Sequence, residues 1–266
     1  VRVSGVSRPA RYRKSACLGT GTCYSLFLGA LNRVALFDLQ ERSLRELNAE
    51  LHRQAALLQQ GADADTEWEV TNPRGSHAVA VGIDGALTVN VRGSVGYYCG
   101  GMNQSGQIHV EGSVGPGVGE NMMSGSIRVT GDASQYAGAT GRGGQLVIEG
   151  NASSRCGISI KGIDIVVRGD VGHMSAFMAQ SGNLVVLGNA GDALGDSIYE
   201  AKLFVRGEVQ SLGADCVKKE MREQHLKHLT GLLERAQISD VRAEEFTRYG
   251  SARQLYHFDV DHADAY

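Results

Sequence analysis

Residues 112–119 read GSVGPGVG, and the spacing of their glycines decides the fold. The pattern G-x-x-G-x-x-x-G could belong to a loop that binds phosphate. A Walker-type loop, however, has Lys and then Ser or Thr directly after its last glycine, whereas Gly119 is followed by Glu120 and Asn121. A dinucleotide-binding loop opens a helix, and this segment leads instead into another strand-like stretch. The glycines therefore indicate turns of the chain rather than a nucleotide site.

The same pattern returns at a constant interval along much of the chain. Apolar residues stand four and two positions before each repeat glycine, a small polar or acidic residue follows it directly, and Val or Ala stands two positions after it. Seven repeats in one register, without insertion or deletion, are the signature of a repeat architecture. The repeat glycines are Gly93, Gly112, Gly131, Gly150, Gly169, Gly188 and Gly207.

The repeat combines a short strand with a corner. Apolar residues at alternate positions bury one face of a strand, and a glycine permits the positive φ of a tight corner. Such units stack so that every rung hydrogen-bonds to the rungs above and below it. The sequence therefore predicts an all-β core, a single-stranded right-handed β-helix (a solenoid) with rungs of about 19 residues over residues 68–213. In this interpretation the repeat glycines are structural.

Helices are predicted on both sides of the repeats, where they would cap the solenoid. Residues 34–67 contain Ser43 followed three positions later by Glu46, the sequence of a capping box, and Gly61 is placed to end the helix. We expect an N-terminal capping helix and a linker in this range. Residues 214–266 contain an amphipathic stretch and are expected to form a C-terminal helix and a tail.

Residues 1–33 carry several arginines and a lysine but no acidic residue, and include an apolar stretch from Ala16 to Ala30. This arrangement is similar to a signal peptide, but the stretch is diluted by Gly, Thr and Ser and is too short to span a bilayer. We interpret residues 1–33 as a basic arm, either disordered or the product of a start site assigned too far upstream. Val34 would then be a sensible start of the protein.

The composition favours a cytoplasmic protein without nucleic-acid or membrane partners. The formal net charge is −3, which gives no electrostatic reason to bind nucleic acid or an anionic membrane. The five cysteines are scattered, odd in number and never spaced C-x-x-C, which favours reduced thiols over a disulfide framework or a zinc site. They are Cys17, Cys23, Cys99, Cys156 and Cys216.

A few residues could hold a metal or act as a nucleophile, and each has a simpler interpretation. His225 and His228 are spaced for one face of a helix, which is more often solvated than metal-binding. Cys156 lies near basic residues that would lower its pKa, but a buried corner cysteine is the simpler interpretation. The most metal-like cluster, near the C-terminus, also fits a strand with one apolar and one polar face. We therefore predict no catalytic, cofactor-binding or metal-binding residue in this chain. The cluster comprises His257, Asp259, Asp261 and His262.

Methionine and aromatic residues gather in the segments that link one rung corner to the next. If these side chains face outward, they form a patch suited to a protein partner. If the segments fold under, the same side chains fill the interior of the solenoid, and the sequence leaves both possibilities open. The candidate interface residues are Tyr97, Tyr98, Asn121, Met122, Met123, Met174, Phe177 and Met178.

These segments also carry a resemblance to a known family. From about Trp68 to Cys216 the glycine rungs resemble the C-terminal β-helix domain of the large subunit of bacterial glutamate synthase. The longer motifs are most similar to the free-standing β-helix subunit of N-methylglutamate synthase (methylamine–glutamate N-methyltransferase). These motifs are GYYCGGMNQ from Gly96, ENMMSG from Glu120, GATGRGG from Gly138, HMSAFMAQSG from His173, GDSIYEA from Gly195 and LGADC from Leu212.

The resemblance implies a scaffold rather than a catalyst. In the fused enzyme a class II amidotransferase domain releases ammonia from glutamine, and a barrel carrying FMN and an iron–sulfur cluster uses it. The β-helix joins the two and has no catalytic residues or cofactor of its own. A chain with the β-helix alone implies a hetero-oligomer with a separate amidotransferase-like subunit and a separate FMN-binding synthase-like subunit. The implied reaction is formation of N-methylglutamate from glutamate and methylamine, or a related amine transfer.

Two alternatives stay open at this point. Similar glycine rungs occur in a subunit of formylmethanofuran dehydrogenase and of the bacterial formyltransferase/hydrolase complex, although the longer motifs fit that family less well. The other alternative is an independent solenoid that binds a ligand such as a carbohydrate. Such a protein would usually show stacked aromatic or acidic residues along one face, and here the single tryptophan, Trp68, precedes the repeats.

Overall fold

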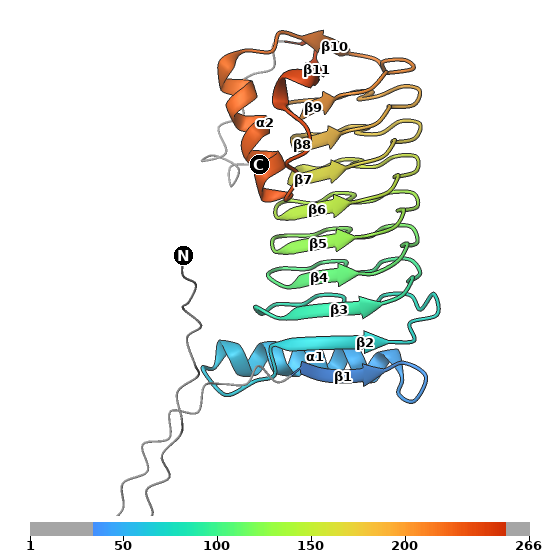
Figure 1. The fold of residues 1–266 in the computed structure, drawn as a ribbon, viewed down its shortest axis with the longest axis vertical. Coiled ribbons are helices and arrows are strands. Elements are labelled where there is room, and N and C mark those ends of the chain that lie inside the picture. Colours follow the sequence, from blue (N-terminus) through green and yellow to red (C-terminus); the bar gives the residue numbers. More distant parts are fainter. Residues whose placement is uncertain (1–33, 254–266) are drawn as a thin grey trace, which may run out of the picture. The chain divides into compact units, whose positions relative to one another are not determined.

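The computed structural model describes residues 34–253, which form a β-solenoid of stacked strands (Figure 1). The strands β1 to β9 pair in parallel in chain order, and β11 and β10 follow as antiparallel neighbours in the same 11-stranded sheet. The predicted fold class is therefore confirmed. The parallel strands are β1 (Val34–Asp38), β2 (Glu67–Thr71), β3 (Thr88–Arg92), β4 (Gln107–Val110), β5 (Ser126–Val129), β6 (Gln145–Ile148), β7 (Lys161–Val167), β8 (Ser181–Val186) and β9 (Lys202–Val205).

The strand register has the same period as the sequence repeat. Ile108 of β4 pairs with Val89 of β3 and with Ile127 of β5, each one sequence repeat away. The same step continues through the sheet to Leu203 of β9. These side chains are buried inside the solenoid, where each stabilises the fold by roughly 1.5–3 kcal/mol. The alternating apolar residues of the repeat are therefore its core.

The repeat glycines allow successive rungs to approach closely, and with one exception they do not supply a positive φ. Only Gly93, with φ +130°, lies in the left-handed region. In the later rungs a side chain would collide with the rung before. At Gly169 a Cβ would lie 2.8 Å from the carbonyl oxygen of Gly150 and 2.3 Å from Oδ1 of Asn151. Close packing of backbone on backbone, rather than corner geometry, is the reason for glycine at these positions.

The polar residue after each repeat glycine forms a ladder along the solenoid. The backbone N–H of Asn151 donates to Oδ1 of Asp132 at 2.7 Å, and that of Asp170 donates to Oδ1 of Asn151 at 2.8 Å. The same step continues to Asn189 and Glu208. A short side-chain oxygen here accepts a hydrogen bond from the backbone of the next rung, which explains why this residue type recurs in the sequence.

The helix α1 (Leu44–Gln59) covers the first end of the solenoid and replaces a preceding rung. The predicted capping box forms at Ser43, and the inward leucines of the helix join the main core. Asn48 donates from Nδ2 to the carbonyl oxygen of Ala78 at 2.8 Å, and its Oδ1 accepts the backbone N–H of Ala80 at 3.1 Å. The side-chain amide of Asn48 therefore supplies the hydrogen-bond partners of one backbone carbonyl and one backbone N–H, which in other rungs are supplied by the backbone of a neighbouring rung.

The strand β1 precedes α1 and was not indicated by the sequence. It pairs in parallel with β2 and buries Phe37, while Leu36 on the opposite face is exposed. The repeat pattern does not reach this strand, because no repeat glycine follows it. The range 34–67 therefore contributes a strand as well as a helix and a linker.

The C-terminal segment, residues 220–246, lies along the outer face of the sheet beside β6 to β9 (Figure 1). It contains α2 (Glu223–Arg235) and a short 3-10 helix (Ala243–Glu245), and it is followed by β11 (Thr247–Ser251), which pairs with β9 and with β10 (Cys216–Lys219). Apolar side chains of this segment pack on outward-facing residues of the strands. The shared cluster is Val147, Val166, Val185, Leu187, Phe204, Leu229, Leu232, Leu233, Ala236, Ile238, Ala243 and Phe246.

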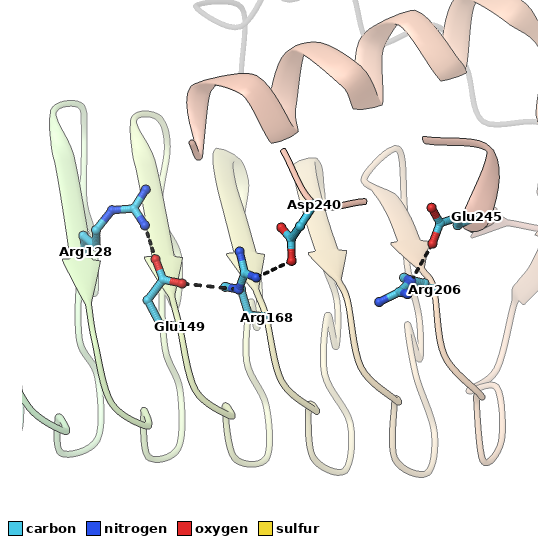
Figure 2. A network of polar contacts seen from close by, with 6 residues as sticks. All are labelled: Arg128, Glu149, Arg168, Arg206, Asp240 and Glu245. Atoms are coloured by element: carbon cyan, nitrogen blue, oxygen red, sulfur yellow. Dashed lines mark hydrogen bonds and ion pairs between the residues drawn. The ribbon is translucent and has the colours of Figure 1, made fainter. Parts of the chain in front are cut away.

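Ion pairs also hold this segment against the sheet (Figure 2). Arg168 lies between two acids: its Nε is 3.5 Å from Oε2 of Glu149, and its Nη2 is 2.6 Å from Oδ2 of Asp240. A second pair joins Arg206 to Glu245 at 2.9 Å. Both pairs link the sheet to residues that follow α2, so apolar packing and charge act on the same segment.

Some predictions fall outside residues 34–253. These are the interpretation of residues 1–33, the metal-like cluster and two of the cysteines. The residues concerned are Cys17, Cys23, His257, Asp259, Asp261 and His262.

Candidate partner-binding surface

Each rung turns through three residues with positive φ, two positions apart. In one rung these are Tyr98 (φ 64°), Gly100 (63°) and Met102 (54°). A left-handed conformation costs a non-glycine residue roughly 1–2 kcal/mol, and hydrogen bonds between rungs hold it. The N–H of Gly100 donates to the carbonyl oxygen of Val79 on the rung before, and that of Met102 to Glu120 on the next. We call residues 97–104 and their equivalents in the other rungs the corner segments.

The predicted interface residues differ in exposure. Tyr97, Met123 and Met178 project from the surface, with 52 %, 45 % and 41 % of their area exposed. Met122 is fully buried and fills the space over Gly144. It is therefore a core residue and not part of the candidate interface. The other four are Asn121, which is exposed, and Tyr98, Met174 and Phe177, which are half-buried.

Two exposed residues of this surface were missed by the sequence reasoning. They are Met102, which is 46 % exposed, and Tyr199, which is 45 % exposed. Met102 precedes Met178 by a whole number of repeats, so the two occupy the same position in their rungs. The repeat register could therefore have identified Met102 once Met178 was chosen.

Corner residues stack into a first outer column along the solenoid. Each backbone N–H of the column donates to the next rung, as Asn121 does to Ala139 at 2.9 Å. The hydroxyl of Thr140 also donates to Oδ1 of Asn121 at 2.7 Å. All members have φ between 52° and 57°. The first outer column is Met102, Asn121, Thr140, Ser159, Met178 and Ser197.

A second outer column runs beside the first, two residues further along each rung. The backbone N–H of Met123 donates to the carbonyl oxygen of Asn103 at 2.8 Å, and that of Lys161 donates to Gly141 at 2.7 Å. Every side chain of this column is exposed. The second outer column is Gln104, Met123, Arg142, Lys161, Gln180 and Tyr199.

The cysteines of the described residues are buried thiols. Burial raises the pKa of Cys99 and of Cys156 to about 12, and that of Cys216 to about 11. A thiol with such a pKa is almost never a thiolate near neutral pH, and the thiolate is the nucleophile. The interpretation of Cys156 as a buried corner cysteine is confirmed, and neighbouring basic residues do not activate it.

The two histidines of α2 have structural partners. Nδ1 of His225 accepts the backbone N–H of Arg222 at 3.1 Å, and Nε2 of His228 lies 2.9 Å from Oδ1 of Asn183. Burial lowers the pKa of both imidazoles. Within residues 34–253 no three His, Cys, Asp or Glu side chains gather as metal ligands. Over the same range no helix has the length and apolarity needed to cross a membrane.

Fold and surface together define a parallel β-solenoid with rungs of about 19 residues and an exposed corner surface. No protein-family model matches the chain. Among curated proteins it is 68 % identical to Protein GlxC of Rhizobium meliloti (strain 1021) over 231 residues, which are 87 % of this chain and 99 % of that relative. The chain therefore belongs to the family of Protein GlxC.

Proposed function

We propose that this chain is the scaffold subunit of a glutamate-synthase-like complex. It joins a class II glutamine amidotransferase-like subunit to a synthase-like subunit that binds FMN and an iron–sulfur cluster. The chain itself contributes surfaces and no reacting group. Its membership of the GlxC family and its resemblance to the β-helix parts of glutamate-synthase-like enzymes support the proposal.

The observation that carries the proposal is where the motifs of the resemblance lie. The stretches GYYCGGMNQ, ENMMSG, GATGRGG and HMSAFMAQSG overlap the corner segments of different rungs. Stacking brings their exposed residues side by side in the two outer columns, although they are far apart in the sequence. Exposed methionine and tyrosine side chains are common at the centres of protein interfaces. This arrangement supports the proposal that the motifs form one surface for a protein partner.

A solenoid is well suited to such a role. Rungs repeat at about 4.8 Å, so six rungs of the outer columns extend over roughly 24 Å. This length is comparable with the side of a standard protein interface, which buries about 800 Å² on each partner. Because every rung is hydrogen-bonded to its neighbours, the spacing of the exposed residues is fixed before a partner binds.

The finer proposal concerns the reaction of the whole complex. Glutamate and methylamine give N-methylglutamate, with ammonia as the second product. The cofactors belong to the synthase-like subunit and the glutamine chemistry to the amidotransferase-like subunit. The resemblance of the longer motifs to the free-standing subunit of N-methylglutamate synthase supports this choice of amine.

The proposal is tested by purifying the tagged full chain with its companions from its own cells. We expect mass spectrometry to identify an amidotransferase-like and a flavoprotein companion, and the visible spectrum to show flavin and iron–sulfur absorption. The purified complex should form N-methylglutamate only when methylamine is supplied. A single colourless chain would contradict the scaffold role. An active complex that ignores methylamine would leave the scaffold role and contradict the choice of substrate.

A further inference from the structure

The second outer column breaks the charge pattern that the rest of the sheet follows. Along the outer face of the sheet, arginines pair with acids: Arg92 pairs with Glu69 at 3.1 Å and with Glu111, and Arg168 pairs with Glu149 and Asp240. Opposite charges on neighbouring rungs stabilise the stack, and like charges in direct register destabilise it.

Arg142 and Lys161 are like charges in direct register. They occupy equivalent positions of consecutive rungs, roughly 4.8 Å apart along the solenoid. Both side chains are exposed, and neither makes an ion pair or a side-chain hydrogen bond to another residue between 34 and 253. Two unpaired stacked cations leave a positive site that an external carboxylate would neutralise.

Apolar side chains stand on both sides of this positive site. Met102 and Met123 lie on two consecutive rungs before it, because Asn103, next to Met102, accepts the backbone N–H of Met123. Met178 and Tyr199 lie on two consecutive rungs after it, because Ala179, next to Met178, accepts the backbone N–H of Tyr199. The order along the solenoid is therefore apolar pair, Arg142, Lys161, apolar pair. Desolvated apolar anchors around a charge contact are typical of the centre of a protein interface.

We propose that this surface docks one of the separate subunits, and that the docked segment presents a carboxylate between two apolar side chains. The inference rests on the proposed function, because that function requires other subunits to bind this chain. The carboxylate would lie against Arg142 and Lys161, and the two apolar side chains would cover Met102 with Met123 and Met178 with Tyr199. Residues 1–33 do not have this chemistry, since they contain no acidic residue.

The direct test is zero-length coupling in the purified native complex. A carbodiimide joins a carboxylate to an amine only when the two are in contact, and Lys161 supplies the amine. We expect a cross-linked peptide that contains Lys161 and an Asp or Glu of a companion subunit. Coupling of Lys161 to the acidic residues of the chain's own C-terminal segment, 254–266, would assign the surface to that segment and overturn the proposal. So would the absence of any Lys161 cross-link in a complex that contains both companions.

A charge reversal with a matched control gives the second test. We expect Arg142→Glu/Lys161→Glu to lower recovery of one companion tenfold or more, because repulsion replaces attraction at the centre of the interface. The control Lys227→Glu reverses an exposed charge on α2 and should change recovery less than twofold. Unchanged circular dichroism and thermal midpoint show that the double variant folds.

The outcomes separate this inference from the proposed function. If both companions bind the double variant as well as they bind the unchanged chain, the docking surface is wrong and the scaffold role stands. If the unchanged chain recovers no companion, the scaffold role fails and the docking surface with it.

Discussion

The outer face of the sheet consists of two halves that share one interior. In β3 to β5 the central outward position is Asn90, His109 or Arg128, and in β7 to β9 the equivalent position is Val166, Val185 or Phe204. The first set is polar, and the second is buried under the C-terminal segment. The inward positions are apolar throughout.

The difference shows that two separate constraints act on each strand. The interior is fixed by the need of every rung to bury one face against the next. The outer face is not needed for this stacking, so its residues are polar where the face is exposed and apolar where another segment covers it. At the central outward position the exposed strands carry polar residues, whereas the strands beneath residues 220–246 carry valine or phenylalanine.

The largest expected loss of stability comes from placing a polar residue at the outward position of a covered strand. Val166→Asp places a carboxylate under the C-terminal segment, where nothing in the apolar cluster can pair with it. We expect a loss of roughly 3–5 kcal/mol in the free energy of unfolding, or release of the segment. Chemical denaturation with limited proteolysis of residues 220–246 would measure it.

The matched control is His109→Asp, which changes the same position three rungs earlier. His109 is only half-buried and has Arg128 as a charged neighbour, so we expect a change below about 0.5 kcal/mol. Equal losses of stability in the two variants would contradict the difference in burial between the two halves of the outer face.

A side chain in place of a repeat glycine should lower the stability of both halves of the sheet alike. In Gly131→Ala and in Gly169→Ala the new Cβ meets the backbone of the rung before at 2.8 Å, and we expect each to lose about 3 kcal/mol by thermal denaturation. Gly231→Ala is the control. A Cβ at this position of α2 would have its nearest neighbour at 3.6 Å, and the substitution replaces a glycine inside a helix. It should gain about 1 kcal/mol, and a similar loss in all three variants would contradict close stacking as the reason for glycine.

A smaller effect is expected where α1 replaces a rung at the end of the polar half. Asn48→Ala leaves the carbonyl group of Ala78 and the N–H group of Ala80 without their partner. We expect a loss of about 2 kcal/mol in the free energy of unfolding. Arg45→Ala, on the exposed side of the same helix, should leave stability nearly unchanged.

The smallest effect concerns pH and the covered half. The hydrogen bond from Arg168 holds the pKa of Asp240 below its ordinary value of 3.8. Because the folded pKa is depressed, the charged pair stabilises the attached segment above about pH 4 and loses this contribution as pH falls through the folded pKa. Hydrogen exchange in residues 236–246, corrected for intrinsic rates, should be faster in Asp240→Asn than in the unchanged protein at pH 6. The two should converge at low pH, and a difference that persists there would contradict this account of the pair.

Much of the fold could be predicted because the interior repeats in the sequence. The inward valines, leucines and isoleucines and the glycine column indicated the solenoid and its period. The cover on the second half also had a signal, since QLVIEG, IVVRG and LVVLG run apolar where QIHVEG and SIRVTG alternate. A strand that is apolar on both faces is usually buried on both.

Other features could not be predicted from the pattern. The strand β1 lies outside the repeat, so only its pairing with β2 reveals it. The sequence did not separate Met122 from Met123, since both follow the corner residue Asn121 and only the structure shows that the first is buried and the second exposed. The reason for the repeat glycines likewise depends on distances between rungs that a sequence does not contain.

The central claim is that this chain joins two subunits that do not join without it. The most direct measurement is the native mass of the two companions mixed with and without the purified full chain. We predict a single species containing all three subunits when the chain is present, and separate companions when it is absent. A complex of the two companions that forms equally well without this chain would contradict the scaffold role.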